Sequence, residues 1–213
     1  MRRGFRVAAP FLPAAFVFGA SFGVLALASG FSALAAVVMS ATTFAGSAQV
    51  ATVSVLGAGG GVAAAVVAAL LLNARYAPIG ITVAHSFRGR VPRRLAEAQL
   101  VVDESWALAG GGTPRFDRGI FLGVGTSLWA AWVGGTAVGS SLGKVVSDTS
   151  VFGLDGAFAA LFLALLATQI HGRRAVAAAL AGASIAAVLT PFTPPGIPII
   201  AATAGVLVGL RRR

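Results

Sequence analysis

The chain has 213 residues, of which 57% are hydrophobic and 10% are charged, and it contains no cysteine. Soluble domains carry about a quarter charged residues, so this composition excludes a soluble protein and predicts an integral membrane protein. Without cysteine, disulfide frameworks and thiolate metal sites are excluded as well. The net charge of +10 comes from arginine clusters beside apolar runs, which indicates anchoring to lipid headgroups and not nucleic-acid binding.

Hydropathy predicts a series of apolar segments joined by short connections rich in Gly, Pro, Ser or charge. The segments are 10–29, 33–56, 62–84, 95–111, 119–142, 154–170, 174–190 and 196–210. About 20 apolar residues form a helix that crosses the hydrocarbon core. We therefore predict an all-α, polytopic membrane helix bundle that forms a single transmembrane transporter domain over residues 1–213.

The second segment contains a polar interruption at the depth of the membrane interior. It reads Ser40-Ala41-Thr42-Thr43-Phe44-Ala45-Gly46-Ser47-Ala48-Gln49. Hydrocarbon offers no water to hydroxyl, amide or backbone groups, so such a stretch has to face protein or a cavity. We predict that it forms one wall of a substrate site, with the binding residues Phe44, Ala45, Gly46, Ser47 and Gln49.

The third segment ends with a second group of polar residues, in which Asn73, Arg75 and Tyr76 precede Pro78 and Gly80. Arg75 has two interpretations that the sequence leaves open: it reaches back to the headgroups, or it faces a cavity and pairs with a carboxylate. A kink at the proline would free backbone carbonyls and favours the cavity. Asn73, Arg75 and Tyr76 therefore join the predicted substrate-binding residues.

The fourth segment, 95–111, carries the acids Glu97, Asp103 and Glu104. An acid at the centre of an inserting helix costs about 2.5–3.5 kcal/mol, so three acids nearly cancel the apolar gain of this segment. Asp103 or Glu104 is predicted to carry a coupling proton, because a desolvated carboxylate takes up a proton more readily. The alternative is that both acids are solvated at the end of a surface helix.

The arginines predict the topology through the positive-inside rule. They cluster before the first segment, within the 85–94 loop, at 173–174 and at 211–213. If every segment crossed the membrane, the 85–94 loop would lie outside, against the rule. The conflict disappears if 33–56 and 95–111 each enter and leave on one side. We predict about six full spans plus two broken or re-entrant segments, with both termini cytoplasmic; seven or eight spans are the alternative.

Glycines four residues apart predict close helix contacts, because they let two backbones approach each other. They occur at 19/23, 119/123, 135/139/143 and 205/209. The set at 135–143 would face either a neighbouring helix or a partner subunit. A glycine pair followed by a glutamine and an arginine occurs in both halves, which weakly indicates an internal repeat; its members are Gly19/Gly23, Gln49 and Arg75, then Gly135/Gly139, Gln169 and Arg173.

Enzyme activity is not predicted. His85 and His171 stand far apart beside arginines, and the sequence has no metal-ligand spacing, nucleophile motif or phosphate-binding loop. We expect no metal and no cofactor. A membrane channel, or a scaffold subunit without transport activity of its own, is the alternative to a transporter.

Four stretches in order resemble the AzlC family, the large subunit of bacterial branched-chain amino acid exporters. The family patterns F-G-x-x-F-G, F-A-G-x-A-Q, L-L-N-x-R and D-E-[ST]-[WF]-A correspond to residues 18–23, 44–49, 71–75 and 103–107. From about residue 119 onward the chain matches only in hydropathy and around residues 158–166. Tyr76 departs from the pattern, since the family often has His there.

The resemblance implies a multi-pass protein of the bacterial inner membrane that exports branched-chain or similar hydrophobic amino acids. It also implies a small membrane partner of the AzlD type. A proton-coupled secondary mechanism fits the charge-poor bundle better than an ATP-driven one. The exact substrate, the coupling ion and the oligomeric state do not follow from the sequence.

Overall fold

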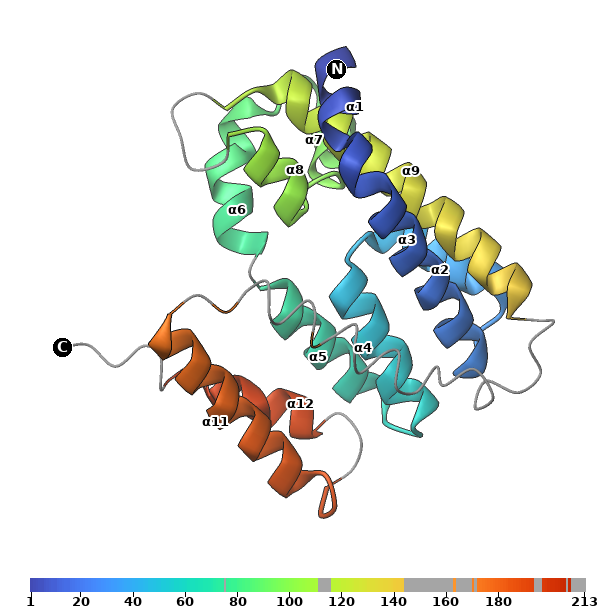
Figure 1. The fold of residues 1–213 in the computed structure, drawn as a ribbon, viewed down its shortest axis with the longest axis vertical. Helices are drawn as coiled ribbons and strands as arrows, with labels where there is room; N and C mark the ends of the chain where they lie inside the picture. The colour runs from blue at the N-terminus through green and yellow to red at the C-terminus, as the bar shows by residue number, and fades with distance from the viewer. Residues whose placement is uncertain are drawn as a thin grey trace.

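The computed structural model describes residues 1–74, 76–110, 116–143, 163, 170, 172–193, 197–205 and 207. Within these residues every regular element is a helix (Figure 1), as the sequence predicts for an all-α protein. The elements are α1 (Arg2–Ala8), η1 (Ala9–Phe11), α2 (Leu12–Ala28), α3 (Ala33–Thr43), α4 (Gly46–Gly57), α5 (Val62–Asn73), α6 (Tyr76–Val83), η2 (Ala84–Ser86), α7 (Val91–Ala98), α8 (Asp103–Leu108), α9 (Arg118–Leu142), α11 (Arg173–Leu189), α12 (Ile197–Ala202) and η4 (Thr203–Gly205).

Two of the described helical runs, Arg2–Ala28 and Arg118–Leu142, are long and apolar enough to cross a bilayer. A third span results if Val62–Asn73 and Tyr76–Ser86, which meet at a 48° bend, are counted together. Most of the predicted segment 154–170 lies outside the described residues. The number of six full spans therefore stays a prediction.

Helices α2 and α9 lie side by side and parallel, and they form the main packed pair of the molecule (Figure 1). Their backbones meet at four glycines, Gly19 and Gly23 on α2 and Gly135 and Gly139 on α9. A Cβ atom on any of the four would overlap backbone atoms of the other helix. Gly135 and Gly139 thus face a neighbouring helix of the same chain, one of the two alternatives that the sequence left open.

The contacts between these two helices are reciprocal. Gly19 faces the backbone of Trp132, and Gly135 faces the backbone of Phe16. In both helices the residue contacted lies three positions before the glycine. Such an exchange is what a twofold axis between two equivalent elements produces. The packing of α2 and α9 is consistent with the predicted internal repeat, although Gln169 of that repeat lies outside the described residues.

The polar interruption separates α3 from α4, and the two helices form a segment that returns to its starting end. Helix α3 begins after Ser32, just beyond the end of α2, and α4 ends at Gly57, where a Cβ atom would lie 2.6 Å from Ser29 Oγ. The middle of the segment, Phe44, packs far from this end, in a cluster with Ala8.

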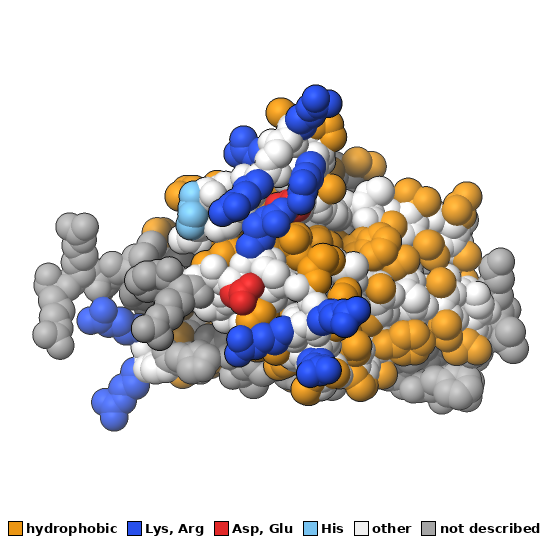
Figure 2. Space-filling view, turned by 90° about the horizontal axis from the view of Figure 1, so that it is seen from above, with side chains coloured by type: hydrophobic (Ala, Val, Ile, Leu, Met, Phe, Trp, Pro, Cys, Tyr) orange, Lys and Arg blue, Asp and Glu red, His pale blue; other side chains and the backbone are white. Residues whose placement is uncertain are grey.

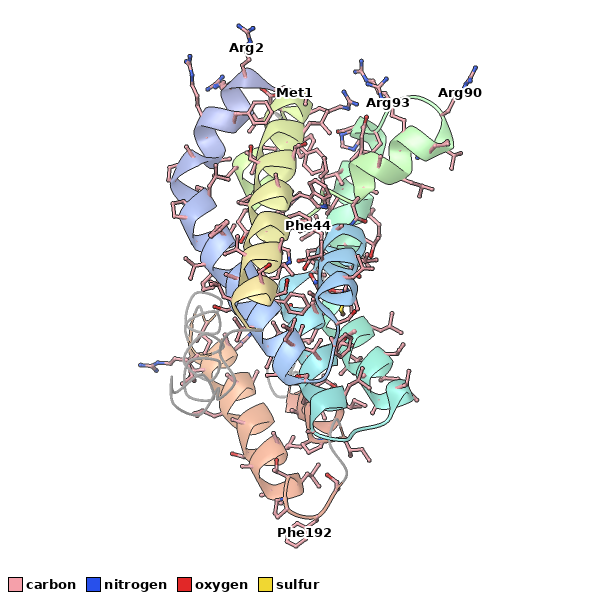
Figure 3. All side chains as sticks on the ribbon, turned by 90° about the vertical axis from the view of Figure 1, so that its right-hand side faces the viewer. Met1, Arg2, Phe44, Arg90, Arg93 and Phe192 are labelled. Atoms are coloured by element: carbon pink, nitrogen blue, oxygen red, sulfur yellow. The ribbon has the colours of Figure 1, made fainter. Side chains whose placement is uncertain are left out.

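The described residues between Glu97 and Arg118, which are 97–110 and 116–118, make a similar excursion from the opposite end. Glu97 at the end of α7 pairs with Arg118 at the start of α9, whereas Val102 between them packs in the same cluster as Phe44. In Figure 3, Arg2, Arg90 and Arg93 lie at one end of the molecule and Phe44 lies about halfway along it. Two returning segments therefore approach each other from opposite ends and meet near Phe44.

The arginines of the N-terminus and of the 85–94 loop lie at the same end of the molecule. Figure 2 shows this end, where Lys and Arg side chains gather, while hydrophobic side chains cover the flank. This shared location is the one that the positive-inside rule requires if both clusters face the same compartment. Which compartment that is remains a prediction.

Neighbouring glycines on α9 provide a test of the α2–α9 packing. Gly135→Ala would place a methyl group against the Phe16 carbonyl, whereas a Cβ atom on Gly134 would lie 3.9 Å from the nearest atom, in the Phe16 ring. Overpacking costs about 1–3 kcal/mol, whereas Gly→Ala at an open helical site gains about 0.5–1 kcal/mol. We expect Gly135→Ala to lower the thermal unfolding temperature in detergent and Gly134→Ala to leave it unchanged or raise it. Equal effects of the two substitutions would contradict the packing.

Candidate functional site

A pocket of about 290 Å³ lies where the two returning segments meet. Its walls come from three interruptions of helices, between α3 and α4, between α5 and α6, and between α7 and α8. The lining residues are Thr43, Phe44, Ala45, Asn73, Tyr76, Gly80, Phe87, Ala98, Gln99 and Val101.

The first wall is shaped by the backbone of Phe44, which ends α3 in the left-handed conformation with φ 42° and ψ 49°. This conformation is uncommon for a bulky residue that is not glycine and costs about 1–2 kcal/mol. The Phe44 side chain is buried among Ala8, Val102, Val124 and Leu128. Burial of the ring offsets the backbone cost and fixes the place where the helix breaks.

A buried hydrogen-bond network holds the break open, and Gln49 is at its centre. Gln49 Oε1 accepts a hydrogen bond from Ala45 N at 3.1 Å, and Gln49 Nε2 donates to Ser40 Oγ at 3.1 Å. The Ser40 hydroxyl lies 2.8 Å from Thr136 Oγ1 on α9. Gln49, Ser40 and Thr136 are all fully buried. The network therefore satisfies polar groups of both half-helices without water.

Carbonyl groups at the end of α3 find partners on other elements. Trp129 Nε1 on α9 donates to Ala41 O at 3.0 Å, and Gln99 Nε2 donates to Thr42 O at 2.6 Å. Gln99 follows the last residue of α7, so its amide joins the tips of the two returning segments. These bonds replace the intrahelical partners that α3 lacks at its C-terminus.

The second wall is the bend between α5 and α6. Asn73 ends α5, Tyr76 begins α6, and both line the pocket. Asn73 Oδ1 is buried, and no hydrogen-bond partner is recorded for it in the part of the chain that the structure describes. Arg75 lies outside the described residues, so both interpretations of this side chain remain open.

The third wall is a turn between α7 and α8 that Ser105 stabilises. Its hydroxyl accepts a hydrogen bond from Val102 N at 3.0 Å and lies 2.7 Å from Leu100 O, to which it donates. Asp103 and Glu104 follow in the first turn of α8, where Asp103 is half-buried and Glu104 is exposed. Neither acid is among the described residues that line the pocket.

The predicted substrate-binding residues thus fall into two groups. Four of them line the pocket: Phe44, Ala45, Asn73 and Tyr76. The other three that are described lie on α4, outside the lining. Gln49 belongs to the buried network, and Ser47 is half-buried. Gly46 lies against the ring of Trp132, where a Cβ atom would be 2.7 Å from Cη2.

Sequence reasoning missed six lining residues: Thr43, Gly80, Phe87, Ala98, Gln99 and Val101. Three of them carried a usable signal, and Thr43 is one of these, because it lies within the polar interruption. Gln99 is an uncharged amide within an apolar segment, and Gly80 marks the predicted kink. Phe87, Ala98 and Val101 look like ordinary apolar residues, and only the folded chain shows that they line the pocket.

An ion-pair cluster holds the arginine end of the pocket wall in place. The Glu97 carboxylate is buried and accepts hydrogen bonds from Arg93 Nε at 3.1 Å and from Arg118 Nε at 3.2 Å, with a further contact to Arg118 Nη2. Burial opposes ionisation of Glu97, but the hydrogen bonds and positive charges of Arg118 and Arg93 outweigh it and lower the pKa of this carboxyl group. The cluster ties α7 to α9 directly beside Ala98 and Gln99.

Within the part of the chain described, no group of three His, Asp or Glu side chains is placed to hold a metal ion. The polar groups of the described lining are the amides of Asn73 and Gln99, the hydroxyls of Thr43 and Tyr76, and backbone groups at helix ends. They suit recognition of a ligand by hydrogen bonds and not bond-breaking catalysis.

Comparison with known proteins gives a consistent picture. The sequence model of the family described as "AzlC protein" matches residues 10–146. The chain is 34% identical to an uncharacterized membrane protein of Archaeoglobus fulgidus, over 96% of this chain and 90% of the relative. It is 30% identical to the branched-chain amino acid transport protein AzlC of Bacillus subtilis, over 98% and 85% of the two chains.

A further relative is the inner membrane protein YgaZ of Escherichia coli, 28% identical over 93% of this chain and 82% of that protein. No solved structure matches the chain. The pocket and its three walls lie within the part of the chain that the family model covers.

The buried network generates a test on α4. Gln49→Met keeps the length of the side chain but leaves Ala45 N–H and the Ser40 hydroxyl with one partner fewer. An unsatisfied buried polar group costs about 1–3 kcal/mol, so we expect a clear fall in the thermal unfolding temperature. Thr52→Val is the control, because Thr52 Oγ1 donates only within α4, to Ala48 O at 2.8 Å. An equally mild effect of both changes would argue against the network.

The Glu97 cluster predicts a pH dependence of stability. Because the pKa of Glu97 is lowered in the folded protein, its ionised form stabilises the fold near neutral pH, and this contribution is lost as the pH falls through that lowered pKa. Wild type should therefore unfold at a higher temperature than Glu97→Gln near pH 7, and the difference should shrink in acid. Glu104→Gln, at an exposed acid, should show no such difference. A gap between wild type and Glu97→Gln that is constant with pH would refute the assignment.

Proposed function

The chain belongs to the AzlC family, and on that premise we propose that it exports branched-chain or similar hydrophobic amino acids across the bacterial inner membrane. The observation that carries the proposal is the pocket between three interrupted helices. Discontinuous helices form the midplane binding sites of many secondary transporters. The volume of about 290 Å³ lies at the lower end of the range for small-ligand sites and suits one amino acid.

The ends of the half-helices match the two charges of an amino acid. Helices α3, α5 and α7 end at the pocket, and α4 and α6 begin there. Helix C-termini carry partial negative charge and helix N-termini carry partial positive charge. In the proposed binding mode the ammonium group binds near the first set of ends, and the carboxylate binds near the second set with help from Arg75.

The apolar part of the lining suits a hydrophobic side chain. The lining includes Phe87 and Val101 next to Phe44, and Ala45, Ala98 and Gly80 leave room beside them. Burial of apolar surface supplies about 25 cal/mol per Å². Leucine, isoleucine, valine and methionine gain from this lining, whereas small or charged amino acids do not.

The two returning segments supply a route for alternating access. In the proposed topology, 33–56 and 95–111 are re-entrant, six other segments cross the membrane, and the arginine end with both termini is cytoplasmic. The tips meet through hydrogen bonds from Gln99 to the end of α3 and through packing of Val102 in the same cluster as Phe44. Movement of one segment relative to the other would open the pocket to one side at a time.

Coupling and assembly complete the proposal. Transport is driven by protons, with Asp103 as the preferred carrier because it is half-buried and two positions beyond Val101 of the pocket wall, whereas Glu104 is exposed. A small membrane subunit of the AzlD type assembles with the chain. The exposed apolar side chains of α5, such as Val62 and Leu70, provide a surface for lipid or for this subunit.

Efflux measurements test the function. Proteoliposomes that contain the protein and its partner, loaded with radiolabelled leucine, should release it faster than empty liposomes, and an imposed proton gradient should increase the release. Asp103→Asn should keep exchange of leucine but lose the response to the gradient. Thr190→Val, at an exposed site distant in sequence from the pocket, is the control.

The proposal is wrong if the protein and its partner do not increase efflux of leucine, valine, isoleucine or methionine over that of empty liposomes. If the partner still assembles with the chain while no substrate moves, the scaffold alternative explains the protein better. If the efflux rate does not saturate as the concentration of any of these amino acids rises, a channel is the better explanation.

A further inference from the structure

A polar atom of the pocket wall lacks a hydrogen-bond partner within the described part of the chain. Asn73 Oδ1 is buried without a hydrogen bond among the described residues, and Asn73 lines the pocket. The other such atom, Trp132 Nε1, belongs to a residue outside the lining. Buried acceptors in native proteins are nearly always satisfied, so an unpaired one beside a pocket points to a ligand that satisfies it.

The described lining offers other hydrogen-bond acceptors besides Asn73 Oδ1. The lining also includes Gln99, whose Nε2 group donates to Thr42 O at 2.6 Å and to Ala41 O at 3.5 Å. Both N–H groups of that amide are directed at α3, so the oxygen is the atom that Gln99 has left for a ligand. Helices α3 and α5 also end here, at Thr43 and Asn73, and their last carbonyls carry partial negative charge.

We propose that Asn73 Oδ1 accepts a hydrogen bond from the α-ammonium group of the transported amino acid and is the residue that selects for it. This inference rests on the proposed function and assigns one specificity-determining contact within the same pocket. An ammonium group brings three N–H donors, a positive charge and no acceptor. It therefore satisfies the unpaired oxygen and suits the negative ends of α3 and α5.

Analogues that lack the amino group make this selection measurable. The 2-hydroxy acid with the leucine side chain offers one O–H donor and no positive charge, and the 2-oxo acid offers no donor. Both keep the carboxylate and the apolar side chain, so the other pocket contacts are unchanged. A site built around a hydrogen bond to one substrate group strongly rejects analogues that lack this group.

The experiment uses the protein with its partner in proteoliposomes and follows exchange of radiolabelled leucine. Unlabelled leucine should compete at concentrations about 100-fold or more below those of the 2-hydroxy and 2-oxo acids. Asn73→Leu, which is close to Asn in size but has no acceptor, should reduce this preference by about tenfold or more, through weaker competition by leucine. Asn73→Asp should keep the preference because it retains an acceptor oxygen.

Val101→Ala is the matched control on the same pocket wall. It removes apolar contacts common to all three compounds, so it should weaken them alike and leave the preference unchanged. Size-exclusion chromatography and thermal unfolding identify variants that do not fold. If Asn73→Leu does not fold, Asn73→Ser, with a shorter side chain, takes its place and is expected to lose the preference too.

The outcomes separate this assignment from the proposed function. Wild-type protein that exchanges no hydrophobic amino acid would overturn both. Wild-type protein that exchanges leucine but accepts the 2-hydroxy acid equally well would overturn the assignment of Asn73 alone. So would a folded Asn73→Leu variant with an undiminished preference for leucine.

Discussion

A helix that breaks inside a membrane exposes backbone groups for which hydrocarbon has no hydrogen-bond partner, and the central part of this structure is organised around that requirement. At the break after Phe44, Gln49 binds the Ala45 amide, Trp129 binds the Ala41 carbonyl and Gln99 binds the Thr42 carbonyl. Each partner comes from a different helix or helix end. The pocket exists because these groups stabilise an open break that would otherwise close into one continuous helix.

Close packing on one side of α9 places its polar partners on the other side. The backbone of Thr136 lies against Gly23 of α2, while its hydroxyl reaches Ser40 of α3. Trp132 has the same double role, since its backbone faces Gly19 and its ring lies against Gly46 and stacks on Phe22 at a centroid distance of 6.2 Å. The glycines of α2 thus determine the position of α9, and with it the positions of the Thr136 and Trp132 side chains beside the break.

Much of this arrangement could be predicted from the sequence. Polar residues in an apolar segment have to face protein, and arginine clusters restrict the topology, so the interruption at 40–49 and the segment with three acids both stood out. Asn73 and Tyr76 line the pocket as the polar end of α5 suggested.

Pairings between distant residues could not be predicted. Nothing near Gln49 in sequence indicates that its amide serves the backbone and Ser40 instead of a substrate, because the network is completed by Thr136 on α9. The pairing of Glu97 with Arg118 is similar. The hydroxyls of Ser40 and Thr136 are 96 positions apart, so at a synthesis rate of about 5–20 residues per second roughly 5–20 s pass before α9 can reach the break. The buried network of the α3–α4 segment is therefore completed only after α9 has been synthesised.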